Sequence, residues 1–127
     1  MKDPCKEAVP GDVLYGKKNL NKGRARPHYI IYLGTSKVAG TFLGAMLTHS
    51  SDFNNISLRE EHFKKKDNAG NDFKVQYENS FIAGELLYKK QDWAPFTKHG
   101  ELTKEGLEFV IHHIGHLIPK FSPLNRK

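Results

Sequence analysis

The pattern of apolar and polar positions predicts a series of short strands followed by a single helix. Strand-like runs occupy residues 9–15, 29–33, 41–48, 73–77 and 80–88, with a weaker signal over 54–57. Residues 29–33 are apolar throughout and lie between Pro27 and Gly34, which predicts a strand buried on both faces. Residues 73–77 alternate between apolar and polar side chains, as a half-exposed strand does. Turns are predicted at 35–40 and 67–72.

The period of the pattern changes near the end of the chain, where apolar residues recur at steps of three and four. They form one helical stripe, made of Leu107, Val110, Ile111, Ile114, Leu117 and Ile118. Thr103 is placed to cap the N-terminus of this helix, and Pro119 is expected to stop it. Gly106 and Gly115 weaken the helix, so packing rather than propensity must hold it. Short strands plus one terminal helix predict a mainly β fold, a small barrel with a C-terminal helix.

Length and composition fit a single domain. The chain has 127 residues, of which 38% are hydrophobic and 27% charged, and eight Phe and five Tyr supply enough apolar area for a core. No apolar run is long enough to span a membrane, and residues 1–7 lack the apolar centre of a secretory signal. A single cysteine cannot form an internal disulfide, so we expect a reducing, cytoplasmic setting.

The positive charge is concentrated in two segments. The chain carries 20 Lys and Arg against 14 Asp and Glu, a net charge of +6. Residues 17–26 contain five basic and no acidic residues, and residues 119–127 add three more basic ones. These segments hold +8, which leaves −2 for the remainder. We expect a basic loop that faces phosphate groups, formed by Lys17, Lys18, Lys22 and Arg24.

The order of short motifs resembles the MazF/PemK family of toxin endoribonucleases. The motifs are Gly11-Asp12-Val13, Arg26-Pro27, Thr48-His49-Ser50, Ala83-Gly84-Glu85-Leu86 and Gly100-Glu101-Leu102-Thr103. The resemblance covers roughly residues 10–118. It implies an SH3-like β-barrel with a C-terminal α-helix, a single domain over 1–127, and a basic tail at 119–127. It also implies a homodimer that cleaves single-stranded RNA and is held in check by an acidic antitoxin protein.

Carried over by position, the resemblance assigns cleavage to Arg26 and Thr48. Cleavage through the ribose 2′-hydroxyl needs a base, an acid and a cation for the phosphate, but no metal or cofactor. The planar guanidinium of Arg26 suits the phosphate, whereas a threonine is a poor base. The nearby candidates for the base are His28, His49 and Glu85.

Two other functions compete with RNA cleavage. The family usually has Asp-Gln where this chain has Gly84-Glu85, and a different loop before Arg-Pro. This departure favours a barrel that binds RNA or DNA without cutting it. The third hypothesis is an interaction protein.

The predicted interaction face lies on the terminal helix. Phe109, His112 and His116 fall away from the predicted apolar stripe and would meet another chain. The spacing of the histidines at 112, 113 and 116 is compatible with a metal site. However, zinc needs three or four protein ligands, and Cys5 lies at the other end of the chain. We therefore expect no metal.

Overall fold

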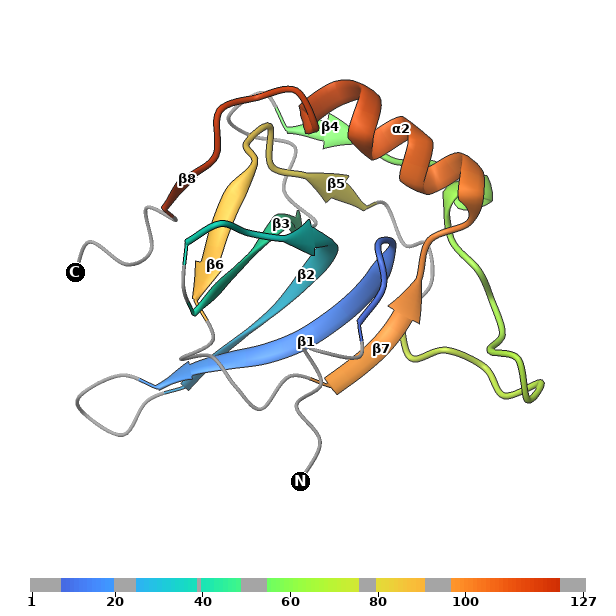
Figure 1. Ribbon diagram of the computed structural model, residues 1–127. Coiled ribbons are helices and arrows are strands. Elements are labelled where there is room, and N and C mark those ends of the chain that lie inside the picture. Colours follow the sequence, from blue (N-terminus) through green and yellow to red (C-terminus); the bar gives the residue numbers. More distant parts are fainter. Residues whose placement is uncertain are drawn as a thin grey trace.

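The computed structural model describes residues 8–19, 25–38, 40–48, 55–75, 80–90 and 97–121. Within these residues lie eight strands, one short 3-10 helix and one α-helix (Figure 1). In chain order these are β1 (Asp12–Asn19), β2 (Ala25–Thr35), β3 (Thr41–Thr48), β4 (Ile56–Ser57), η1 (Glu60–His62), β5 (Phe81–Ile82), β6 (Leu87–Lys90), β7 (Thr97–Glu101), α2 (Lys104–Ile114) and β8 (Lys120–Phe121). The prediction of a mainly β fold with one C-terminal helix is confirmed.

All eight strands belong to one curved sheet, whose main path runs β4-β5-β3-β2-β1-β7. Strand β3 pairs with β2 along one edge, and with both β5 and β6 along the other. Strand β8 adds to β6 in parallel. The residues after β4 lead back to β7, where Phe63 and Leu102 form a single bridge. A single bridge is not a pair of hydrogen-bonded strands. Among the described residues, the two ends of the sheet therefore meet at one position only.

The central strands are buried on both faces, as their apolar sequence predicts. One core cluster, which includes Val13, Ile31 and Leu47, lies on the face covered by α2. The other cluster lies on the opposite face and consists of Leu14, Ile30, Tyr32 and Phe42. Neighbouring residues of one strand therefore enter different cores, which is the alternation that a strand imposes.

Several strand boundaries differ from the sequence prediction. Strand β1 starts at residue 12 rather than 9 and continues to residue 19, and β2 extends the predicted run at both ends. The predicted strand at 80–88 is two short strands, because the chain leaves the edge of β3 between them. Strand β3 has the predicted bounds.

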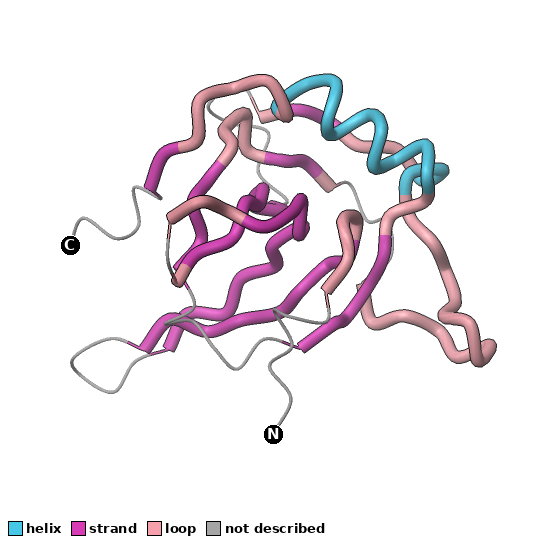
Figure 2. The backbone as a smooth tube through the Cα atoms, in the orientation of Figure 1, coloured by secondary structure: helices cyan, strands magenta, loops and turns pink. Residues whose placement is uncertain are grey.

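The segment predicted as a strand over 73–77 is not one in its described part, residues 73–75. Val75 is buried, but it meets β7 through one hydrogen bond, from its N–H to the carbonyl of His99 (2.9 Å). Residues 76 and 77 lie outside the described part. The predicted turn at 67–72 is present: Gly70 has a φ of 87°, and Oδ1 of Asp67 accepts the N–H groups of Ala69 and Asn71. This loop projects beyond β7 before the chain returns (Figure 2).

Helix α2 begins as predicted but ends earlier and turns a different face inward. Thr103 is the N-cap, and its Oγ1 accepts the N–H of Gly106 (3.0 Å). The helix ends at Ile114, ahead of Pro119. Its buried positions are Gly106, Val110 and Ile114, whereas two members of the predicted stripe, Ile111 and Ile118, are 46% and 89% exposed.

Gly106 sets this orientation. A Cβ at this position would collide with the backbone of η1, 2.9 Å from the Cα of His62 and closer still to its carbonyl oxygen. The same carbonyl accepts the N–H of Thr103 (2.9 Å). The glycine that weakens the helix by propensity is therefore what lets the helix lie directly on η1.

The prediction that Phe109 points away from the core is wrong. Its ring is partly buried against the cluster beneath α2. It lies between the rings of His62 and His113, with ring centroids 4.4 Å from each. Because the buried face is centred on Gly106 rather than Leu107, the whole helix is rotated relative to the predicted wheel, and Phe109 moves toward the core.

In the part of the chain that the structure describes, none of the helices has the length and apolar character needed to cross a bilayer.

Substitution of Gly106 by alanine should destabilise the protein by about 1–3 kcal/mol, because the added methyl group has to displace the backbone of η1. Propensity alone predicts the opposite sign, a gain of about 1 kcal/mol. Chemical denaturation measures the difference. Glu108→Ala, on the exposed side of the same helix, is the matched control and should change stability by less than about 0.5 kcal/mol. An increase in stability for Gly106→Ala would contradict the close contact.

Candidate functional site: one end of the sheet and its aromatic rings

The segment predicted as a basic loop is largely a β-hairpin. Strands β1 and β2 pair through seven residues on each side, and the pairing places Lys17 opposite Pro27 and Lys18 opposite Arg26. The backbones of these residues lie in the sheet, although their side chains fall outside the described part. Lys22 and Arg24 lie outside the described residues altogether. The hairpin therefore brings basic positions from both of its strands together at its tip.

Strand register also places the start of β2 beside the end of β3. Tyr29 of β2 is opposite Leu47 of β3, so Thr48 follows at the next position, level with residue 28. On its other side, Thr48 pairs with Phe81 of β5. Neighbouring strands lie about 4.8 Å apart. The backbone positions of Arg26, His28 and Thr48 thus share one end of the sheet, while His49 lies outside the described residues.

Glu85 is held by a basic side chain. It lies between β5 and β6, and its Oε1 is 2.9 Å from Nζ of Lys120 in an ion pair. The backbone reinforces this contact, since the N–H of Lys120 donates to the carbonyl of Leu86 (3.0 Å). The carboxylate of this candidate base is therefore engaged by a lysine.

The histidines of α2 and of the turn that follows it are exposed. His112 and His116 face solvent, in agreement with their predicted position on the helix, and His113 contacts Phe109. No group of three or more His, Cys, Asp or Glu side chains is arranged to hold a metal ion in the described ranges.

Three rings that the sequence analysis did not single out form a row across the sheet. Tyr15 of β1 lies opposite both Tyr29 of β2 and Thr97 of β7. The imidazole of His99 stacks on the ring of Tyr15, with centroids 4.7 Å apart and an interplanar angle of 13°. The two tyrosine rings are tilted by 55° at 5.3 Å. All three side chains are partly buried. We call this row the aromatic strip.

His99 occupies a β-bulge, which explains how it reaches Tyr15. Lys98 pairs with Leu14 and Gly100 with Val13, so His99 is an extra residue in β7 with no partner in β1. Bulges re-aim side chains and are common beside functional sites. No sequence signal marked this position, because residues 97–101 are polar and show no strand pattern.

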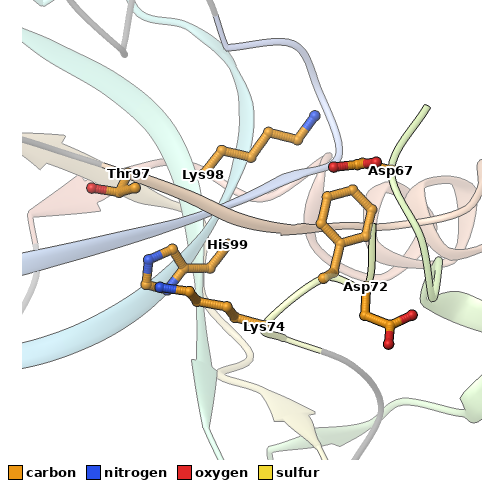
Figure 3. Close-up of a pocket in the computed structure, with 7 residues that line it drawn as sticks. Asp67, Asp72, Lys74, Thr97, Lys98 and His99 are labelled. Carbon is orange, nitrogen blue, oxygen red and sulfur yellow. The ribbon is translucent and has the colours of Figure 1, made fainter. Parts of the chain in front are cut away.

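A pocket of about 350 Å³ adjoins the strip. It is lined by Asp67, Asp72, Phe73, Lys74, Thr97, Lys98 and His99. Figure 3 shows the amine of Lys74 beside the imidazole of His99, whereas the amine of Lys98 points elsewhere. Burial, and then the positive charge of Lys74, lower the pKa of His99 below its ordinary value. Both effects favour the neutral form of the imidazole, which stacks on Tyr15.

A network of ion pairs fixes β7 next to this pocket. Nζ of Lys98 lies 2.9 Å from Oε1 of Glu101 and 3.1 Å from Oδ1 of buried Asp12. The other carboxylate oxygen of Glu101 accepts from Lys64. Burial by itself would raise the pKa of Glu101, but the hydrogen bonds from Lys64 and Lys98 outweigh it, and the pKa lies below its ordinary value.

Comparisons with known proteins do not place this chain: no protein-family model, no curated protein and no solved structure matches it.

The lowered pKa of Glu101 predicts a loss of stability in acid. Because the folded-state pKa lies below the ordinary value of 4.5, the carboxylate's contribution is complete above pH 4.5 and disappears as the pH falls through the folded-state pKa. Urea denaturation at pH values from 7 down to 3 measures this decline. Glu101→Gln should be less stable than the unmodified protein at pH 7 and should lose less stability on acidification. Parallel pH profiles for the two proteins would rule out this role.

Proposed function

We propose that the protein is a metal-independent endoribonuclease of the MazF/PemK type, which cleaves single-stranded RNA on a sheet that closes as an SH3-like barrel. The observation that supports this most directly is the register of β2 and β3. It brings the backbone of residue 28 level with Thr48, with Arg26 two residues further along the same strand. The two residues that the resemblance assigns to cleavage, Arg26 and Thr48, thus come from adjacent strands at one end of the sheet.

The chemistry assigned to this end is attack by the ribose 2′-oxygen on the adjacent phosphorus. A bond forms between the 2′-oxygen and phosphorus, the bond to the 5′-oxygen breaks, and the products are a 2′,3′-cyclic phosphate and a 5′-hydroxyl. Arg26 would neutralise the charge that builds up on the phosphate oxygens. Thr48 would donate a hydrogen bond to one of them. A histidine, His28 or His49, would take the proton of the 2′-hydroxyl as a neutral imidazole, and a water molecule would supply the proton that the departing 5′-oxygen takes up to become the 5′-hydroxyl.

The basic hairpin formed by β1 and β2 would bind two partners, the RNA substrate and an acidic antitoxin. RNA would approach along the positions opposite each other at 18 and 26, where its phosphates offset the repulsion between like charges. An acidic antitoxin protein would cover the same positions and so block the substrate. The resemblance further implies that the chain works as a homodimer.

One observation favours a second candidate, a module that binds RNA without cleaving it. The carboxylate of Glu85 is engaged by Lys120 at 2.9 Å. Glu85 also lies outside β5, the strand whose Phe81 pairs with Thr48. Glu85 is thus a poor candidate for the base, and the enzyme depends on one of the two histidines.

We expect the pure protein to cleave single-stranded RNA in the presence of EDTA, and Arg26→Ala to reduce the rate by about 100- to 1,000-fold, the usual cost of losing one group that stabilises a transition state. Arg59→Ala is the matched control, because Arg59 is an exposed arginine just before η1 that forms a long ion pair with Glu61 (3.9 Å). It should leave the rate unchanged. Gel analysis of RNAs of varied sequence, with detection of the cyclic phosphate end, measures the outcome.

Two results would decide against the enzyme. Cleavage that persists in Arg26→Ala would point to a contaminating nuclease. Salt-dependent binding of RNA with no cleavage of any sequence would establish the second candidate instead.

A further inference from the structure

The aromatic strip is a surface with no part in the cleavage chemistry. Its rings, Tyr29, Tyr15 and His99, lie on three neighbouring strands and are in mutual contact, with centroid distances between 4.7 and 5.8 Å. Tyr15 and His99 are only partly buried, and because they stack on each other each ring covers one face of the other. A base would therefore have to stack on the second face of either ring. Single-stranded nucleic acids are bound in this way, by stacking of successive bases on aromatic side chains beside a positive charge.

The positive charge is supplied by Lys74. Two other lysines near the pocket already have partners: Lys66 pairs with Asp72 at 2.8 Å, and Lys98 with Asp12 and Glu101. No carboxylate among the described residues forms an ion pair with Lys74, whose side chain is exposed. Its amine stands beside His99, at the point where the strip meets the pocket (Figure 3).

The pocket can take an anionic ligand despite its two aspartates. The carboxylate of Asp72 is neutralised by Lys66, and Oδ1 of Asp67 accepts two backbone N–H groups within its own loop. A volume of about 350 Å³ lies in the range of small-ligand pockets. The ring of Phe73 forms part of the lining and lies 5.8 Å from the amine of Lys98.

The strip also borders the proposed cleavage site. Tyr29 pairs with Leu47, so it is one step along the strands from Thr48 and three residues from Arg26. Alternation along β3 places Leu47 and Thr48 on opposite faces of the sheet. An RNA bound at both places would therefore pass around the end of the strands rather than run along one face.

We propose that the aromatic strip and Lys74 form a base-stacking subsite for single-stranded RNA, with bases on Tyr15 and His99 and a phosphate on Lys74. This subsite rests on the proposed function only for the identity of its ligand. The β-bulge at His99 is the device that builds it, because a regular β7 would pair this residue with β1 and aim its ring elsewhere.

The test is the affinity of a single-stranded RNA that cannot be cleaved, with 2′-O-methyl groups throughout, measured by fluorescence anisotropy. Lys74→Ala should weaken binding several-fold and lower the slope of log K against log salt by about one. His99→Ala should weaken binding about tenfold, through loss of stacking, whereas His99→Phe keeps a ring and should bind as the unmodified protein does. Lys104→Ala, an exposed lysine at the start of α2, is the matched control and should have no effect.

Wild-type affinity in both Lys74→Ala and His99→Ala would overturn the subsite. Because Lys74 is exposed, its substitution remains informative even if His99→Ala fails to fold. The outcome is separable from that of the proposed function. Binding that depends on Lys74 and His99 in a protein that cleaves no RNA would sustain the subsite and refute the enzyme. Cleavage of RNA with an unchanged KM in both Lys74→Ala and His99→Ala would support the enzyme and refute the subsite.

Discussion

The seating of helix α2 on the backbone of η1 is the contact on which the arrangement of the molecule depends. The carbonyl of His62 accepts the N–H of Thr103 and lies against Gly106, while Oγ1 of Thr103 donates to the carbonyl of Glu61 (2.8 Å). The next residue, Phe63, bridges to Leu102. One short segment therefore seats the helix and joins the β4 end of the sheet to β7. A residue larger than glycine does not fit at position 106, because a Cβ there would collide with the backbone of His62.

This seat also determines where β7 lies, and with it the aromatic strip. Strand β7 is held by β1 on one side, and on the other by hydrogen bonds with Lys64 and Val75. Ion pairs from Lys98 to Asp12 and Glu101 fix it further. Between these anchors, the bulge at His99 is the one irregular position, and it turns an imidazole onto Tyr15. A rigid frame around a single extra residue is a good way to hold a functional side chain in place.

Sequence correctly predicted the elements whose own residues carry the apolar pattern. It failed for the elements whose conformation or orientation is determined by tertiary contacts. Residues 29–33 and 41–48 are apolar enough to predict central strands, and the position of Thr103 predicts the helix N-cap. Residues 97–101 form a strand because of their neighbours and ion pairs, which a polar sequence does not reveal. The helix stripe was misplaced because Gly106 counts as neutral in a hydrophobic pattern, yet lies at the centre of the contact. The motifs point to Thr48 and the start of β2 as candidate positions, whereas no motif marks Lys74 or His99.

The separation of the strip's members along the chain has a consequence for folding. Tyr15 and Tyr29 belong to one hairpin and can meet early, because only a short loop has to close between them. His99 joins them from the far end of the sequence, after every intervening strand has found its place, and such distant contacts form slowly. In a folding chain, the basic hairpin would thus form before the complete aromatic strip. Full affinity for a ligand on the strip would be reached only when the last strands of the sheet have paired.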